Sequence, residues 1–299
     1  MTAKRPGTGK KPAAASRNRD VLIARAVICS MIFIVTFAVG MLIFCAVCRK
    51  NAGWRDIPSI TADTDMSADG TDSLPPYGDG FLSDMSGFEE YINPIRKMRD
   101  AFLMVCGKNN PVKAVPDDLT ALPSDISESA ISLRLYPEKA LEAMFTEMDA
   151  LGVPLTDTSG KQLSVISGYI SAEEQQAQFD SEVARILKKD PTLTKSMAES
   201  IASVTVSRPG ENEHQSGLSA DISFPGMTAQ AFGKTDTFRW LKDNSWKFGF
   251  ILRYPEGKED RTGSISEPWH FRYVGRHHAA EMYRLGLCLE EYVDSLISK

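Results

Sequence analysis

The stretch that decides the fold is residues 213–224, Glu-His-Gln-Ser-Gly-Leu-Ser-Ala-Asp-Ile-Ser-Phe. Its second half alternates between apolar and polar side chains, and the apolar ones are Leu218, Ala220, Ile222 and Phe224. Because successive side chains of a strand point to opposite faces of a sheet, this alternation predicts a strand with one face in the core. Asp221 lies on the other face, where it is available for chemistry.

A second informative stretch is Glu267-Pro268-Trp269-His270-Phe271-Arg272-Tyr273. Proline disfavours a helix here, so we expect a loop that enters a strand at His270. His214 stands seven residues before Asp221, and His270 stands three residues after a glutamate. Two imidazoles and one carboxylate form a ligand set of catalytic zinc sites, and one carboxylate remains over. Each half alone is a weak signal, because a lone histidine beside a strand is more often structural.

Apolar periodicity and turn signals predict further elements on both sides of these stretches. Three helices are expected, at 137–152, at 171–190 and from residue 276 to the C-terminus. The second begins at the capping box Ser171-Ala172-Glu173-Glu174 and ends at Asp190-Pro191. Strands are expected at 163–166, 250–254 and 270–274. Strands and helices are mixed without a regular βαβ rhythm, so we expect an α+β domain with a small antiparallel sheet and flanking helices.

The charge of the chain is unevenly distributed. The chain has 299 residues and a net charge of −5, but its first 50 residues hold nine Lys or Arg and one acidic residue. Residues 51–299 are therefore strongly acidic, and no nucleic acid partner is expected, because nucleic-acid-binding domains usually present a basic face. Cys106 and Cys288 are the two cysteines after residue 50, and a disulfide between such distant residues cannot be inferred from sequence.

Residues 26–48 contain no charged residue and no proline. As a helix they would extend about 34 Å, at roughly 1.5 Å per residue, which is enough to span a bilayer. Their length and the Arg49-Lys50 pair that follows favour a retained transmembrane helix over a cleaved signal peptide. The excess of Lys and Arg before the helix favours a cytoplasmic N-terminus, so we expect a single-pass protein of the cell membrane.

Four regions follow from these patterns. We expect a cytoplasmic basic tail at 1–25, the transmembrane helix at 26–48, an acidic flexible linker at 49–95 and an extracytoplasmic domain at 96–299. The linker is rich in Asp, Ser, Gly and Thr and shows no apolar period, whereas the last 200 residues alternate apolar runs with turn signals.

Four separated motifs stand in one order along the chain: Arg208-Pro209-Gly210, Glu213-His214-x-x-Gly217-Leu218-x-x-Asp221, Gly249-Phe250-Ile251-Leu252-Arg253-Tyr254-Pro255 and Glu267-Pro268-Trp269-His270-Phe271-Arg272-Tyr273-Val274-Gly275. Over about residues 100–299 the chain thereby resembles the VanY-type D-alanyl-D-alanine carboxypeptidases. The resemblance implies a fold shared with other zinc D-Ala peptidases and the hedgehog signalling domain. It implies that His214, Asp221 and His270 are the ligands of a Zn²⁺ cofactor. It also implies Glu267 as the catalytic base and a peptidoglycan stem peptide as the substrate.

The resemblance also suggests substrate contacts. We expect Ser171, Gln175 and Trp269 to bind the substrate, although Ser171 is equally suited to cap a helix. Where the family has an arginine in the preceding turn, this chain has Ile170, which cannot donate a charge-assisted hydrogen bond to a carboxylate or an oxyanion.

Two arginines are candidate substitutes for the missing one. Arg272 shares the strand face of His270 by alternation, and Arg253 lies in a neighbouring motif. A buried structural salt bridge is at least as expected for each of them.

The leading hypothesis is a membrane-anchored zinc carboxypeptidase that removes the terminal D-Ala from peptidoglycan stem peptides. An L,D-carboxypeptidase that acts on tetrapeptide stems is an alternative, because the shape of the substrate pocket decides the bond. A non-catalytic peptidoglycan-binding module is another, because Ile170 replaces the arginine, although the presence of Glu267 argues against it. A further alternative is a purely structural membrane protein with Trp269, Phe271 and Tyr273 as core aromatic residues, which would bind no stoichiometric zinc.

Overall fold

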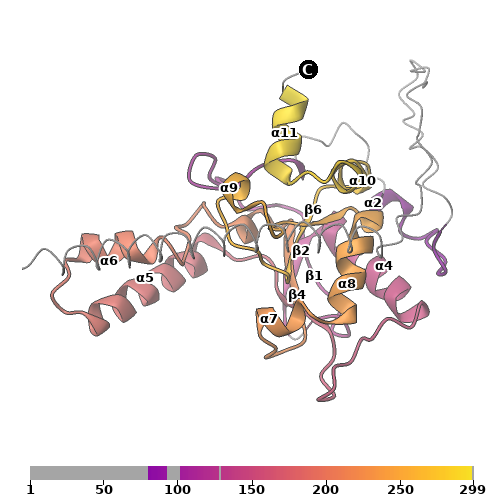
Figure 1. Cartoon of the computed structure of the whole chain (residues 1–299), viewed down its shortest axis with the longest axis horizontal. Coiled ribbons are helices and arrows are strands. Elements are labelled where there is room, and N and C mark those ends of the chain that lie inside the picture. Colours follow the sequence, from indigo (N-terminus) through magenta and orange to yellow (C-terminus); the bar gives the residue numbers. More distant parts are fainter. Residues whose placement is uncertain (1–79, 93–101, 128, 298–299) are drawn as a thin grey trace, which may run out of the picture. The chain divides into compact units, whose positions relative to one another are not determined.

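The computed structural model describes residues 80–92, 102–127 and 129–297 (Figure 1). The predicted cytoplasmic tail, the transmembrane helix and most of the linker lie outside the described residues. In the part of the chain that is described, no helix has both the length and the apolar character that a membrane span requires.

A four-stranded antiparallel sheet forms the centre of the domain. Across the sheet the order is β3 (Ser164–Ser167), β4 (Ser219–Ser223), β6 (His270–Tyr273) and β5 (Phe250–Leu252). A second, two-stranded sheet pairs β1 (Leu119–Ala121) with β2 (Ser132–Arg134). The predicted α+β architecture with a small antiparallel sheet is confirmed, as are the positions of its strands.

The hydrophobic core is built around β4 and α4 (Leu135–Ala150). The alternating apolar side chains of residues 218–224 are buried in it, as predicted, and so are Leu141, Met144 and Met148 of α4. The polar face of β4 is less open than expected, because Ser219 and Ser223 are also buried. Asp221 is the half-buried residue of this strand.

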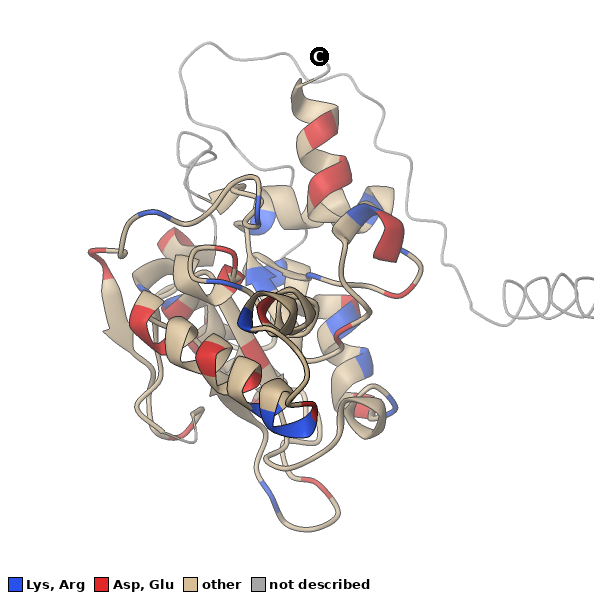
Figure 2. Ribbon diagram, turned by 90° about the vertical axis from the view of Figure 1, so that its left-hand side faces the viewer, with Lys and Arg blue, Asp and Glu red and all other residues tan. Residues whose placement is uncertain are grey.

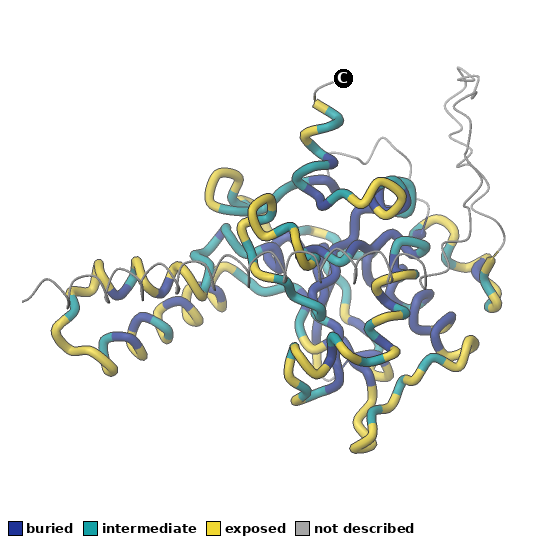
Figure 3. The backbone as a smooth tube through the Cα atoms, in the orientation of Figure 1, coloured by how far each residue is buried: buried dark blue, intermediate teal, exposed yellow. Residues whose placement is uncertain are grey.

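Helix α5 (Ala172–Lys189) begins where the capping box predicts. The Glu174 N–H donates to Ser171 Oγ at 3.1 Å, and the Ser171 N–H donates to the Glu174 carboxylate at 2.8 Å. Helix α6 (Lys195–Ala202), which the sequence did not predict, lies beside α5 (Figure 1). The two helices share a small core of their own, and exposed residues line much of their length (Figure 3).

The C-terminal segment is two helices, so the expectation of a single helix from residue 276 was wrong. Helix α10 (Arg276–Leu285) ends at Gly286, whose φ of +66° is a left-handed conformation that glycine adopts readily. Helix α11 (Leu289–Ile297) follows after a short turn. The apolar periodicity continues through the break, and the glycine was its sequence signal.

The remaining described elements are short: α2 (Glu89–Ile92), η2 (Glu213–Ser216), α7 (Ala229–Phe232), α8 (Asp236–Asn244), η3 (Ser245–Phe248) and α9 (Glu259–Thr262). Residues 80–92 fall in the predicted flexible linker, yet Phe81, Met85, Phe88 and Ile92 pack against the main core. The folded domain therefore begins upstream of the predicted boundary at residue 96, because these apolar side chains add to its buried surface.

The cysteines of the described domain are free thiols. Cys106 is half-buried and Cys288 is buried. The disulfide that the sequence left open is not formed in this structure.

Candidate metal centre and active site

The three side chains that the family resemblance assigns to zinc converge in the fold. One ligand atom from each of His214, Asp221 and His270 lies within 4.8 Å of the other two. His214 Nε2 and His270 Nδ1 lie 3.3 Å and 2.8 Å from the same Asp221 Oδ1 atom. The two imidazole rings are nearly perpendicular, at 85°, with centroids 4.9 Å apart. Three donor atoms thus face one small volume, as the ligands of a single ion must.

Sheet register and a helix cap place these residues. Asp221 and His270 are cross-strand partners on β4 and β6. His214 lies on η2, and its backbone N–H donates to Asn212 Oδ1 at 2.9 Å. This cap satisfies an N–H group at the start of η2 and so fixes the position of the first histidine.

Two glycines allow the close backbone approaches around His214. A Cβ on Gly168 would lie 2.7 Å from the Ser132 carbonyl oxygen, so glycine lets β3 and β2 approach at this point. Gly217 ends η2 with a φ of +67°, and a Cβ there would lie 2.9 Å from Arg134 Cγ. Both positions therefore favour glycine, and the second also favours it by its backbone conformation.

Outer hydrogen bonds fix the tautomers of both histidines. His214 Nδ1 lies 2.7 Å from the Gly168 carbonyl oxygen, which can only accept, so Nδ1 carries the proton and Nε2 faces Asp221. His270 Nε2 lies 3.2 Å from Glu213 Oε2, which leaves Nδ1 to face Asp221. Metal-bound histidines generally make such a second contact to a carbonyl or a carboxylate.

The surroundings favour a positive charge at this centre. Burial lowers the pKa of His270, but hydrogen bonds to Asp221 and Glu213 outweigh it and raise the pKa to about 9. Burial opposes ionisation of Asp221, yet His214 and His270 hold its pKa below the ordinary range. A metal cation can replace the proton that His270 holds. Two nitrogens, one oxygen and satisfied outer contacts fit a catalytic Zn²⁺ site, which keeps another position for water or substrate.

Glu267 lies on the loop that leads into β6, as Pro268 predicts. Its N–H donates to the Tyr254 carbonyl at 3.0 Å, and its Oε1 accepts from Ser264 Oγ at 3.1 Å. Burial raises the pKa of this carboxyl, and the charge of His270 opposes the shift. A carboxylate of raised pKa takes up a proton more readily than an ordinary glutamate, which suits a general base.

Sequence reasoning did not identify Glu213 as a functional residue. It is buried, and its Oε2 contacts His270 and accepts from Ser219 Oγ at 3.0 Å. Its Oε1 accepts from Arg253 Nε at 2.9 Å and from Arg272 Nη1 at 2.5 Å. Burial opposes ionisation of Glu213, but the two arginines outweigh it and hold its pKa well below the usual value. The available signal was an acidic residue next to a predicted ligand and two arginines within strand motifs.

The predicted substrate contacts have different outcomes. Ser171 caps α5, so the alternative role for this residue is confirmed. Gln175 is 1% exposed, and its amide donates to the Ser207 carbonyl at 2.7 Å and accepts from Asn212 Nδ2 at 2.6 Å. The carbonyl end of Gln175 thus supports Asn212, which caps η2, and its amide end binds the Ser207 carbonyl, while its substrate contact stays a prediction. Trp269 is half-buried and packs partly against the core, and its substrate contact stays a prediction.

Neither candidate arginine is free to replace the family arginine, whose position Ile170 occupies in this chain. Arg253 and Arg272 are at most 1% exposed, and both are bound to Glu213. Arg272 also donates to the carbonyls of Phe102 and Met104. The alternative of buried structural ion pairs is therefore confirmed for both.

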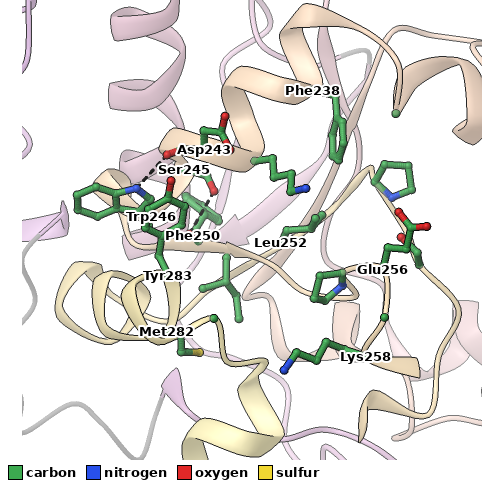
Figure 4. A pocket seen from close by; sticks show the side chains of 18 of the residues that line it. Phe238, Asp243, Ser245, Trp246, Phe250, Leu252, Glu256, Lys258, Met282 and Tyr283 are labelled. Atoms are coloured by element: carbon green, nitrogen blue, oxygen red, sulfur yellow. Dashed lines mark hydrogen bonds between the residues drawn. The ribbon is translucent and has the colours of Figure 1, made fainter. Parts of the chain in front are cut away.

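A cavity of about 970 Å³ lies along β5, between α8, η3 and α10 (Figure 4). Aromatic and apolar side chains, among them Phe238, Trp246, Leu252 and Tyr283, line it. None of the three clustered donor residues lines this cavity. In the loop that carries Glu267, the cavity is lined by Ser266 and Pro268 but not by Glu267 itself. We therefore place the chemistry at the cluster of His214, Asp221 and His270 instead.

Comparisons with known proteins identify the family of this chain. A family model described as VanY, D-alanyl-D-alanine carboxypeptidase, matches residues 131–276. A D-alanyl-D-alanine carboxypeptidase of Enterococcus faecalis is 33% identical over 268 residues, which cover 87% of this chain and 90% of that protein. The putative carboxypeptidase YodJ of Bacillus subtilis is 35% identical over 229 residues, or 72% of this chain and 78% of that protein.

Solved structures show the same similarity. A variant of the D,D-pentapeptidase VanY from a VanB-type vancomycin resistance cassette, in complex with Zn(II), covers 64% of this chain and 99% of its own, with 34% identity and a TM-score of 0.50. VanYB in complex with D-alanine-D-alanine covers 64% and 97%, with 35% identity and a TM-score of 0.51. The LD-carboxypeptidase LdcB covers 64% and 84%, with 35% identity and a TM-score of 0.53. By its sequence and its fold, the chain belongs to the VanY family of D-alanyl-D-alanine carboxypeptidases.

Proposed function

We propose that the protein is a zinc-dependent D,D-carboxypeptidase that removes the terminal D-Ala of peptidoglycan stem peptides. The observation that carries this proposal is the convergence of His214, Asp221 and His270 within 4.8 Å. The name of the Enterococcus faecalis relative and the D-alanine-D-alanine bound to VanYB support a D,D bond. Similarity to LdcB makes the L,D bond of a tetrapeptide stem the competing choice.

The chemistry divides between the metal and Glu267. When bound, Zn²⁺ supplies a Lewis acid that polarises the scissile carbonyl. Glu267 accepts a proton from the attacking water as the water oxygen bonds to the carbonyl carbon. The same carboxyl then donates this proton to the leaving nitrogen as the C–N bond breaks and D-Ala departs. Burial of Glu267 raises its pKa and helps it to hold the proton between the two steps.

Recognition of the substrate carboxylate is expected to be weak in this chain. Ile170, half-buried in the turn between β3 and α5, carries no charge. Arg253 and Arg272 are held in buried ion pairs with Glu213. We therefore expect a high KM on peptides with a free terminal carboxylate.

The proposed location is the outer side of the cell membrane, with residues 26–48 as the anchor. The uncharged stretch of 23 residues supports a membrane span. The excess of basic residues before it supports a cytoplasmic N-terminus. Protease treatment of intact cells should then remove the carboxypeptidase domain and leave an N-terminal fragment in the membrane. Protection of the domain from the protease would overturn the proposed orientation.

The activity is tested by incubating the zinc-loaded protein with synthetic penta- and tetrapeptide stems, with the products identified by mass spectrometry. We expect loss of one D-Ala from the pentapeptide. Glu267→Gln should slow this reaction by about 10²–10⁴-fold while zinc stays bound. Glu256→Gln, at an exposed position in a turn, is the matched control and should leave the rate unchanged.

Other products would change the assignment. Release of D-Ala from the tetrapeptide alone identifies the L,D bond. A folded, zinc-loaded protein that binds the peptides and cleaves neither is a non-catalytic binding module.

A further inference from the structure

A glutamate of the C-terminal helix joins the buried charge cluster at the metal centre. Glu290 on α11 contacts Arg253 with both carboxylate oxygens, Oε1 to Nη2 at 2.5 Å and Oε2 to Nη1 at 3.0 Å. The Arg253 side chain is 1% exposed, and that of Glu290 is 16% exposed. Figure 2 shows α11 as the helix next to the marked C-terminus, with its acidic residues in red. This ion pair links an outer helix to the interior.

The same arginine reaches the metal centre through one more carboxylate. Arg253 Nε donates to Glu213 Oε1 at 2.9 Å, and Glu213 Oε2 lies 3.2 Å from His270 Nε2. A continuous path of polar contacts therefore runs from α11 to a predicted zinc ligand. Glu290 lies beyond residues 131–276, the part that matches the family model.

Guanidinium geometry makes this path sensitive to orientation. The donors of an arginine are fixed in a planar fork, so a two-point contact sets the direction in which its third nitrogen points. Here Glu290 holds the two terminal nitrogens of Arg253, and Nε points to Glu213. Without Glu290, a buried cation loses the partner of two of its nitrogens and moves toward the carboxylate that remains.

A movement of Glu213 changes the metal ligand directly. Its Oε2 atom is the outer partner of His270, and this contact leaves Nδ1 of the imidazole toward Asp221. A less constrained carboxylate lets the imidazole ring rotate. Ring rotation moves the ligand nitrogen away from the position that the metal requires.

We propose that Glu290 is a positioning residue of the metal centre. By way of Arg253 and Glu213 it keeps the imidazole of His270 in the orientation that binds zinc, so zinc affinity depends on how α11 docks. This inference rests on the proposed zinc-dependent function. Its test, however, measures the zinc affinity of the protein in the absence of peptide.

The same helix offers a matched control. Glu291 contacts Lys258 Nζ with both carboxylate oxygens, at 2.9 Å and 2.7 Å, and accepts from the Cys288 N–H at 2.9 Å. Its removal takes an anchor from α11, as removal of Glu290 does. Among the described residues its carboxylate contacts Lys258 and Cys288 rather than Arg253 or Glu213, so Glu291 tests the stability of the helix without the path to His270.

The experiment measures zinc affinity of the full-length protein in detergent, by competition with a chromophoric chelator. Loss of an outer partner of a metal ligand commonly reduces metal affinity about 10–100-fold. Glu290 lies two contacts beyond such a partner, Glu213, so we expect Glu290→Gln to reduce zinc affinity by about tenfold. Glu291→Gln should bind zinc like the wild type. With Co²⁺ in place of zinc, the visible absorption bands should change in Glu290→Gln alone, because they report the arrangement of the ligands.

The outcomes separate this inference from the proposed function. Wild-type affinity in Glu290→Gln, or equal losses in both variants, overturns the positioning role, while peptide cleavage by the wild type leaves the proposed function standing. A wild-type protein that binds no zinc overturns both. If Glu290→Gln does not fold, Glu290→Asp keeps the charge with a shorter reach, and it should also weaken zinc binding and change the Co²⁺ spectrum.

Discussion

Asp221 and His270 stand opposite each other on β4 and β6, and Asp221 Oδ1 lies 2.8 Å from His270 Nδ1. A slip of either strand by one residue would turn one of these side chains to the other face of the sheet. The apolar neighbours that prevent such a slip are Ala220, Ile222 and Phe271, which are fully buried. Burial of the core therefore sets the register, and the register brings the two donor atoms together.

Removal of the anionic ligand should release the metal. We expect Asp221→Asn to weaken zinc binding by more than the roughly 100-fold that loss of an outer partner costs, because the substitution removes a charge that touches the ion. Metal analysis after dialysis against a chelator measures the effect. Asp180→Asn, on the exposed side of α5, should keep its zinc, and stoichiometric zinc in Asp221→Asn would contradict the ligand assignment.

Restoring the family arginine should improve substrate binding. Ile170→Arg is expected to raise kcat/KM on stem peptides about tenfold or more, because a hydrogen bond to a charged group contributes about 1.5–3 kcal/mol. The gain should appear mainly as a lower KM. A peptide with a C-terminal amide is the control, because it lacks the carboxylate, and an equal gain on both peptides would show that the arginine acts in another way.

Replacement of Gly217 should cost more stability than replacement of Gly152. The two glycines have φ values of +67° and +66°, so alanine at either is strained by about 1–2 kcal/mol. A Cβ at position 217 would also lie 2.9 Å from Arg134 Cγ, whereas nothing lies within 4 Å at position 152. Urea unfolding of Gly217→Ala and Gly152→Ala compares the two, and equal losses would mean that Arg134 moves aside without cost.

Glu138, in the first turn of α4, predicts a pH dependence of stability. Its side chain is 2% exposed. Burial and the neighbouring Glu142 raise its pKa from 4.5 to about 7. The folded protein thus holds a proton that the unfolded chain releases between these values. The contribution of Glu138 to the free energy of unfolding is therefore complete below pH 4.5 and is lost as the pH rises through about 7.

Glu138→Gln should remove this part of the pH dependence. Relative to the wild type, the variant should gain stability as the pH rises from 4 to 8, because an amide needs no proton to be buried uncharged. Urea unfolding at both pH values gives the difference in the free energy of unfolding between the variant and the wild type at each pH. A difference between variant and wild type that does not change with pH would rule out titration of Glu138 in this range.

Local patterns carried much of the prediction. The alternation of residues 218–224 predicted β4, and the capping box at Ser171 predicted the start of α5, because both signals depend on neighbours within a few positions. The motifs around His214 and His270 offered two imidazoles and two carboxylates, the family resemblance assigned His214, Asp221 and His270 as ligands, and the fold brings these three together. The break at Gly286 was also readable in principle, but the continuous apolar period outweighed it.

The sequence by itself determined which residue types meet at the centre: two imidazoles and a carboxylate, carried by motifs whose local structure follows from short-range rules. Only the tertiary structure decided which charged groups are free and which are bound. Glu213 meets His270 across 57 positions, and Arg253 meets Glu290 across 37. Such partners are chosen by strand register and helix docking, because a buried charge must find its counter-charge wherever the packed core places one.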